Sequence, residues 1–140
     1  VGKYISPKFA HKYYDEIGLG IDFTARDLQS MLKEKGLPWE KSKAFDHSAI
    51  IGDFLPKNNY TSLENLNFEL RKNSEIVQKG ATSMMLWNID EIVSYVSHKK
   101  KKKKGDIIFT GTPKGVASVK ENDVLEGFLE GKQMFKIQVK

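Results

Sequence analysis

One stretch of the chain, Gly20 to Gln29, brings together three side chains that could bind a metal ion and an anionic ligand. Its apolar first half predicts a strand that ends near Asp22, and a helix is expected from Ala25 to Lys35. Arg26 and Gln29 then point along the same line as Asp22. Carboxylate oxygens suit hard cations and a guanidinium can bind an acid in a bidentate manner. The alternative is a surface corner where Asp22 and Arg26 only pair with each other at i,i+4.

The expected helix has start and stop signals of its own. Thr24 is predicted as the N-cap, and Asp27, three residues on, would complete a variant capping box near the positive end of the helix. Leu28 and Leu32 form the apolar side. Gly36 is expected to end the helix.

A second candidate ligand site is the run Gly111-Thr112-Pro113, which follows an apolar stretch at 106–110 that predicts a buried strand. Glycine lets the backbone approach a ligand closely. The Thr112 hydroxyl and nearby N–H groups could hold a carboxylate. A bare Gly-Thr-Pro is also an ordinary turn, so that alternative stays open.

The composition indicates a single water-soluble domain. The chain has 140 residues, of which 39% are hydrophobic and 29% charged, and it contains no cysteine. Disulfides, thiol catalysis and cysteine metal sites are therefore excluded, and a reducing, cytoplasmic location is expected. No stretch approaches the roughly 18 apolar residues of a membrane span, so no membrane partner is expected. The first residue is Val1, not an initiator methionine.

The net charge of +5 comes mostly from six consecutive lysines, Lys99 to Lys104. Without them the chain would be near neutral. A nucleic-acid surface usually adds spread phosphate contacts and aromatic stacking positions, and none is interleaved here. We therefore expect a solvated lysine run and no nucleic-acid partner, with a basic nucleic-acid binder as the alternative.

The other predicted elements are many short strands and a few helices, an α+β arrangement. Inward-facing aromatic side chains are expected at Phe9 and Tyr13. Trp39 and Phe45 are expected in the core, with a lid over the site as the alternative. A hairpin is expected to turn at the Lys72-Asn73 step. The remaining predicted elements are a helix at 6–14, strands at 17–23, 49–52, 67–71, 74–78, 124–128 and 134–139, a loop at 53–62, and a helix capped by Asn88 or Asp90 that ends near His98.

Three motifs, in order, resemble successive signatures of the fumarylacetoacetate hydrolase family. They are Asp-Phe-Thr-Ala-Arg-Asp-Leu-Gln at 22–29, Lys-Gly-Leu-Pro-Trp at 35–39 with Lys-Ala-Phe at 43–45, and Thr-Gly-Thr-Pro-Lys-Gly-Val at 110–116. The match covers nearly the whole chain and is closest to the acylpyruvase and oxaloacetate decarboxylase branch. It implies a β-rich, mixed-sheet α+β roll with a few short helices.

The resemblance also implies roles for residues. Asp22 would be a ligand of a divalent metal, most simply Mg²⁺, with Mn²⁺ or Ca²⁺ as alternatives. Lys43 would be the catalytic lysine that neutralises charge on the substrate or on a developing enolate, although a lysine close to Lys41 could also be a surface residue. Arg26, Gln29 and Thr112 would contact the acid end of a small oxo-acid substrate. A homodimer is implied as well.

The reaction implied is cleavage of a C–C bond in a 2-oxo or 2,4-dioxo acid, such as oxaloacetate or an acylpyruvate, through a metal-stabilised enolate. An isomerase or tautomerase acting on an unsaturated oxo-diacid shares that enolate and is the first alternative. An inactive fragment or a binding module that keeps the fold is the second.

Two elements that the resemblance implies are missing. A Glu-x-Glu pair and a His-x-x-Glu dyad should precede Asp22, but the chain contains no Glu-x-Glu, and His11 is followed by Asp15 with no glutamate at i+3. Residues 1–140 are therefore expected to form a single domain of this type that lacks its N-terminal part.

Overall fold

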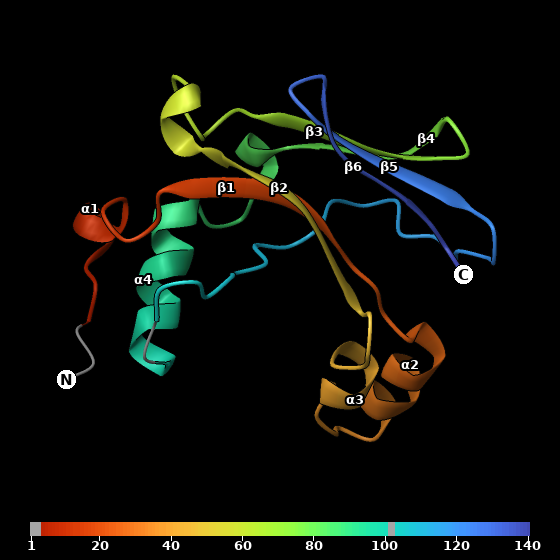
Figure 1. Cartoon of the computed structure of the whole chain (residues 1–140). Coiled ribbons are helices and arrows are strands. Elements are labelled where there is room, and N and C mark those ends of the chain that lie inside the picture. Colours follow the sequence, from red (N-terminus) through yellow and green to blue (C-terminus); the bar gives the residue numbers. More distant parts are fainter. Residues whose placement is uncertain (1–3, 101–102) are drawn as a thin grey trace.

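The structure is a computed structural model that describes residues 4–100 and 103–140 (Figure 1). It has short helices, a two-stranded sheet and a four-stranded sheet. In chain order the elements are α1 (Pro7–Ala10), β1 (Glu16–Asp22), α2 (Arg26–Glu34), α3 (Glu40–Lys43), β2 (Ala49–Pro56), the 3-10 turn η1 (Lys57–Asn59), β3 (Asn67–Lys72), β4 (Glu75–Ala81), the 3-10 turn η2 (Thr82–Met84), α4 (Ile89–Lys99), β5 (Val124–Leu129) and β6 (Lys132–Gln138).

The two-stranded sheet carries helices α2 and α3 at one end. Strands β1 and β2 are antiparallel, with Asp22 opposite Ala49 and Glu16 opposite Pro56. The chain therefore leaves this sheet at Asp22 and returns at Ala49, and α2 and α3 lie in between, at the lower right of Figure 1. This connection places the end of β1 beside both helices.

The larger sheet is antiparallel in the order β4-β3-β5-β6 and packs against β1 and β2. The core between the sheets is built on Leu66, Leu129 and Met134, with side chains of β1 and β2 packed around them. A Cβ on Gly52 would lie 2.6 Å from the Met134 carbonyl oxygen, so β2 crosses β6 at a distance that only glycine allows. Each fully buried aliphatic side chain stabilises the fold by about 1.5–3 kcal/mol.

Helix α4 packs on α1 through Ile5, Ala10 and Val93. Asn88 caps α4, because its side chain accepts a hydrogen bond from the Glu91 N–H at 2.9 Å while the Glu91 carboxylate accepts from the Asn88 N–H at 2.8 Å. The prediction of a helix capped at this point is confirmed.

The predicted hairpin is also confirmed, but its turn lies one residue later than expected. Asn73 and Ser74 both have positive φ values, 52° and 71°, between β3 and β4. Two mirror-image turn residues of this kind suit the twist of antiparallel strands. Asn73 is held there by its side chain, which accepts from the Val124 N–H and donates to Asp123, both at 2.8 Å.

Several local predictions are wrong. The first helix ends at Ala10 and not near Tyr14, and Phe9 and Tyr13 are exposed. Trp39 and Phe45 are also exposed, and the Lys33 ammonium lies 5.0 Å from the centre of the Trp39 ring. The Phe9 ring likewise lies 5.9 and 5.4 Å from the Lys8 and Lys12 ammonium groups, so these two rings have lysine partners in place of a core position. Strand β2 continues to Pro56, through part of the predicted loop, because it pairs with β1 along that length.

The predicted buried strand at 106–110 does not form. This segment has no strand pairing, and Ile107 and Phe109 are exposed. Phe109 lies across β1: a Cβ built on Gly20 would be 3.1 Å from its ring. The segment crosses β1 and does not add a strand to either sheet.

The lysine run begins at the end of α4, where Lys99 is the last helical residue and Lys100 the C-cap. Lys101 and Lys102 lie outside the described residues. Among the described residues no helix is both long and apolar enough to cross a membrane.

Candidate active site

The end of β1 carries an ion pair between two residues that the sequence singled out. The Lys43 Nζ lies 2.6 Å from Asp22 Oδ2 and 2.8 Å from Thr24 Oγ1. Lys43 is the last residue of α3, and Asp22 is the last residue of β1. The two side chains keep 34% and 44% of their surface exposed, respectively, so the pair is open to a ligand from solvent.

The position of Lys43 is fixed by the residue before it. Ser42 is fully buried, and its hydroxyl donates to the Trp39 carbonyl at 2.6 Å. Its own carbonyl accepts a hydrogen bond from the Ala25 N–H at 3.0 Å. These bonds join α3 to the corner between β1 and α2, so the lysine is held over Asp22 although 21 residues separate them in sequence.

The prediction that Thr24 caps α2 is wrong, because the Thr24 hydroxyl makes its hydrogen bonds elsewhere. The N-cap is Ala25, without a side-chain hydrogen bond. The Thr24 hydroxyl accepts from Lys43 and makes a long contact of 3.4 Å to the Asp22 carbonyl. Thr24 therefore belongs to the Lys43 site and not to the helix end.

Arg26 and Gln29 form the second pair at this corner. The Arg26 Nη1 donates to Gln29 Oε1 at 2.7 Å, and Gln29 is only 5% exposed. The buried amide thus holds one edge of an exposed guanidinium. The simple Asp22–Arg26 corner pair is not the ion pair in this structure, since the Asp22 carboxylate pairs with Lys43.

Thr112 is exposed in a loop that lies against β4. The Gln78 Nε2 donates to Thr112 Oγ1 and to the Pro113 carbonyl, both at 3.1 Å. Three residues span at most about 11 Å, so Thr112 lies within that reach of Phe109, whose ring contacts β1 at Gly20. In the part of the chain that the structure describes, no hydrogen bond joins Thr112 to the Asp22–Lys43 pair.

The sequence analysis missed Gln78. It falls in a predicted strand with an ordinary polar and apolar alternation, and its partner Thr112 is 34 residues away. Nothing in the local pattern distinguishes it from a solvent-facing glutamine.

The described residues do not complete a metal site. Across 4–100 and 103–140 no group of three or more His, Asp or Glu side chains is placed to hold an ion. Asp22 offers one carboxylate, whereas Mg²⁺ and Ca²⁺ take six or more oxygen ligands, several of which can be water or substrate. Asp22 therefore fits as one ligand of such a site and not as the whole of it.

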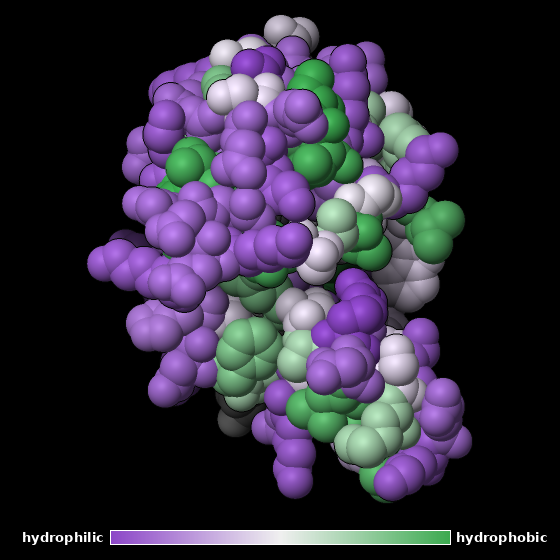
Figure 2. Space-filling view, turned by 90° about the vertical axis from the view of Figure 1, so that its right-hand side faces the viewer, coloured by the Kyte–Doolittle hydropathy of each residue, from purple (hydrophilic) through white to green (hydrophobic). Residues whose placement is uncertain are grey.

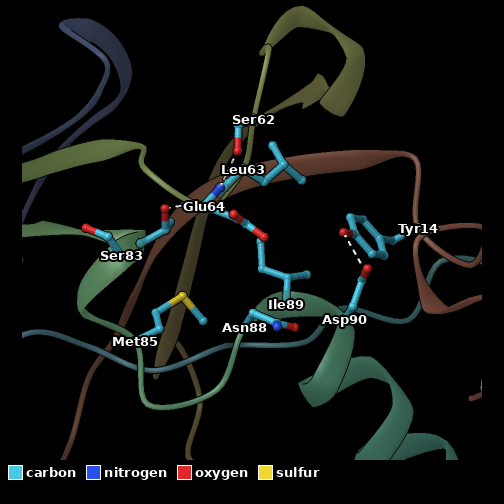
Figure 3. Close-up of a pocket in the computed structure, with 10 residues that line it drawn as sticks. Tyr14, Ser62, Leu63, Glu64, Ser83, Met85, Asn88, Ile89 and Asp90 are labelled. Carbon is cyan, nitrogen blue, oxygen red and sulfur yellow. Dashed lines mark hydrogen bonds between the residues drawn. The ribbon is translucent and has the colours of Figure 1, made fainter. Parts of the chain in front are cut away.

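A separate hollow of about 550 Å³ lies at the N-terminus of α4 (Figure 3). Tyr14 donates a hydrogen bond to Asp90 at its rim, at 2.9 Å, and burial together with the Asp90 carboxylate raises the pKa of the Tyr14 phenol. The residues that line it are Tyr14, Ser62, Leu63, Glu64, Thr82, Ser83, Met85, Asn88, Ile89 and Asp90. None of the five predicted site residues is among them, so the hollow is not the site described above.

Comparison with known proteins bears on what this corner does. The sequence model of the fumarylacetoacetate (FAA) hydrolase C-terminal family matches residues 2–139. Oxaloacetate tautomerase FAHD1, mitochondrial, of Bos taurus is 42% identical over 96% of this chain and 61% of its own length. Oxaloacetate decarboxylase, mitochondrial, of Dictyostelium discoideum is 36% identical over 93% of this chain and 60% of its own. The chain spans about three-fifths of the length of these relatives.

Solved structures agree with the fold. The crystal structure of fumarylpyruvate hydrolase from Pseudomonas aeruginosa in complex with Mn²⁺ and pyruvate superposes with a TM-score of 0.90 at 33% identity. The superposition covers 96% of this chain and 58% of the hydrolase chain. The predicted α+β fold and the predicted resemblance are both confirmed: the chain belongs to the fumarylacetoacetate hydrolase family.

Proposed function

We propose that the full-length protein is a divalent-metal-dependent enzyme that acts on a 2-oxo carboxylic acid, oxaloacetate or an acylpyruvate, through an enolate. The observation that carries this proposal is the placement of the Lys43 ammonium beside Asp22, at the corner where α2 begins with Arg26, whose guanidinium Gln29 holds. This arrangement offers a metal ligand and two cations at one corner. The names of the relatives, an oxaloacetate tautomerase and an oxaloacetate decarboxylase, support the substrate class.

Asp22 is the metal ligand that this chain would contribute. The ion would act as a Lewis acid that lowers the free energy of the enolate. We propose Mg²⁺, with Mn²⁺ or Ca²⁺ as alternatives; the Mn²⁺ in the related fumarylpyruvate hydrolase supports a divalent ion.

Arg26 would bind the carboxylate that the substrate carries before it reacts. A guanidinium has five N–H donors, and the bond to Gln29 leaves enough of them for a bidentate contact. The Gln29 Oε1 is engaged by Arg26, so in this arrangement Gln29 contributes by orienting the guanidinium. Thr112 would add a hydroxyl donor to the same acid group.

Lys43 would stabilise charge that appears only during the reaction. The ammonium is placed by α3 before substrate binds, so it needs no rearrangement when an enolate oxygen becomes negative. Its hydrogen bonds to Asp22 and Thr24 define where that oxygen would lie, within reach of Nζ.

Two outcomes of one enolate distinguish the candidate reactions. If the bond beyond C3 breaks, oxaloacetate loses CO₂ or an acylpyruvate is hydrolysed, and pyruvate is formed. If only a proton moves between C3 and the keto oxygen, the keto and enol forms of oxaloacetate interconvert and pyruvate is not formed. The second reaction is favoured by the name of the Bos taurus relative.

The test uses the purified full-length protein with oxaloacetate and with acetylpyruvate. Pyruvate release and enol absorbance are followed in parallel, with Mg²⁺, after chelation, and after Mg²⁺ is restored. We expect turnover that chelation abolishes and Mg²⁺ restores. Turnover that persists without metal would contradict the metal role, and no turnover of either substrate would contradict the substrate class.

The homodimer and the cytoplasmic location stay predictions. Light scattering of the full-length protein measures the first. Cell fractionation measures the second, and the relatives named as mitochondrial make that compartment the alternative outcome.

A further inference from the structure

We propose that Gln78 is a positioning residue that turns the Thr112 hydroxyl toward the carboxylate of the substrate. The inference rests on the proposed function, since it assigns Thr112 to the acid end of a 2-oxo acid. It adds a residue from β4 to a site otherwise built from β1, α2 and α3.

The direction of the hydrogen bond carries the argument. The Gln78 Nε2 can only donate, and it donates to Thr112 Oγ1 at 3.1 Å. The hydroxyl oxygen is therefore an acceptor on that side, and its own hydrogen points elsewhere. A threonine held in this way presents a donor to an anion.

The loop that carries Thr112 depends on this side chain. Within the described residues, no backbone-to-backbone hydrogen bond of a turn, loop or cap involves residues 107–119. Gln78 supplies two hydrogen bonds to it, at Thr112 and at Pro113, both 3.1 Å long. The loop is thus positioned by side-chain bonds and packing, and Gln78 provides the bonds nearest to Thr112.

Packing places the loop directly on β4. A Cβ on Gly115 would lie 2.8 Å from the Val77 carbonyl oxygen and 3.3 Å from Gln78 Cγ, and the φ of Gly115 is +103°. A Cβ on Gly80 would lie 3.0 Å from Pro113 Cβ. These contacts leave no room for the loop to move closer to β4, and they keep Thr112 within hydrogen-bond distance of the Gln78 amide.

The test is a double-mutant cycle in the full-length enzyme, with oxaloacetate and acetylpyruvate as substrates. Gln78→Met keeps an unbranched side chain of similar length but removes both donors. We expect KM to rise about tenfold, as for one lost hydrogen bond to a charged group, with kcat changed less than threefold. Thr112→Val should raise KM by a similar factor, and Gln78→Met should then change KM less than twofold in the Thr112→Val background.

The matched control is Gln138→Met. Gln138 also donates a side-chain hydrogen bond from a strand, to Asn122 Oδ1 at 3.2 Å, but it lies on β6. It should leave KM and kcat unchanged. If Gln78→Met does not fold, Gln78→Glu keeps the side-chain shape while the carboxylate accepts the Thr112 hydrogen, and its effect on KM should again be smaller when Thr112 is valine.

Three outcomes would overturn the inference, provided that the wild type is active. They are an unchanged KM in Gln78→Met, changes in KM that add up when Gln78→Met and Thr112→Val are combined, and a loss in Gln78→Met that is confined to kcat. A wild type that turns over neither substrate would overturn the proposed function, and the inference with it. The two failures are therefore separated by the wild-type measurement alone.

Discussion

Replacing Lys43 by methionine separates the role of this residue in catalysis from its role in the fold. Methionine keeps the length of the aliphatic chain and removes the ammonium. In the structure the ammonium contacts Asp22 and Thr24 at 2.6 and 2.8 Å. The charge on the enolate exists only as the bond breaks, so losing the ammonium should affect the transition state most.

The two magnitudes are expected to differ widely. The side chains of Lys43 and Asp22 are 34% and 44% exposed, and exposed ion pairs contribute about 0.2–1 kcal/mol to stability. The free energy of unfolding should therefore fall by no more than about 1 kcal/mol. Removing one preorganised electrostatic donor costs about 10²- to 10³-fold in kcat, so we expect kcat to fall at least about 10²-fold with a small change in KM.

Steady-state kinetics on oxaloacetate and acetylpyruvate, together with urea unfolding of the same samples, measure both quantities. Lys41→Met is the matched control, because Lys41 lies on the same helix and is exposed without an ion pair among the described residues. It should leave kcat unchanged. A Lys43→Met variant with normal kcat and raised KM would show that Lys43 binds the ground state, and the assignment would be refuted.

Four further predictions concern Arg26, Asp22, the lysine run and Asp123. Arg26→Met should mainly raise KM, since the carboxylate it binds is charged before the reaction; a fall in kcat alone would argue against that role. Asp22→Ala should abolish metal-dependent turnover and leave the circular dichroism spectrum unchanged, and retained Mg²⁺-dependent turnover would remove it from the metal site. Replacing lysines 100–103 by Ser and Gln should leave kcat/KM unchanged. Sub-micromolar binding of duplex or single-stranded nucleic acid at physiological salt that depends on these lysines would instead favour a nucleic-acid role. The logarithm of the binding constant would then fall by roughly 0.9 per phosphate contact for each log unit of salt. Hydrogen bonds from the Lys120 N–H and the Asn73 amide lower the pKa of Asp123. The stabilisation from the Asp123 carboxylate is therefore present above its unfolded pKa of about 3.9 and is lost as pH falls through its folded pKa. Urea unfolding of Asp123→Asn should show a smaller loss of stability between pH 5 and pH 2 than the wild type, and an equal loss would contradict this.

Local patterns predicted the elements whose stability is local. The turn of the β3–β4 hairpin and the cap at Asn88 follow from turn residues and a capping box that lie within a few positions of one another. The end of α2 just before Gly36, a residue with a φ of +62°, was predictable for the same reason. Asp22, Arg26 and Gln29 were identified because they fall within this short range.

Contacts between distant segments could not be read from the sequence. The Lys43 ammonium donates a hydrogen bond to the Thr24 hydroxyl from 19 residues away in sequence, and Thr24 does not form the predicted cap of α2. The apolar run at 106–110 has the composition of a buried strand, but it joins neither sheet, and the Phe109 ring packs against Gly20 of β1.

The lower end of the molecule, formed by α2 and α3, shows another limit of composition. Hydrophobic side chains remain exposed there, among them Met31, Leu37, Trp39 and Phe45. Figure 2 shows hydrophobic (green) surface at this lower end of the molecule. Aromatic character alone predicted a core position for the last two. Exposure depends on what packs above a residue, and a single sequence does not give that information.

The central claim is that Asp22, Lys43, Arg26 and Thr112 surround one 2-oxo acid on one metal ion. A crystal structure of the full-length protein with Mn²⁺ and oxalate, a stable planar dianion that resembles the enolate of pyruvate, tests this most directly. We predict an anomalous peak about 2.0–2.6 Å from an Asp22 carboxylate oxygen, with oxalate oxygens in contact with the Lys43 ammonium and the Arg26 guanidinium. An ion bound away from Asp22, or oxalate bound without either cation, would contradict the account.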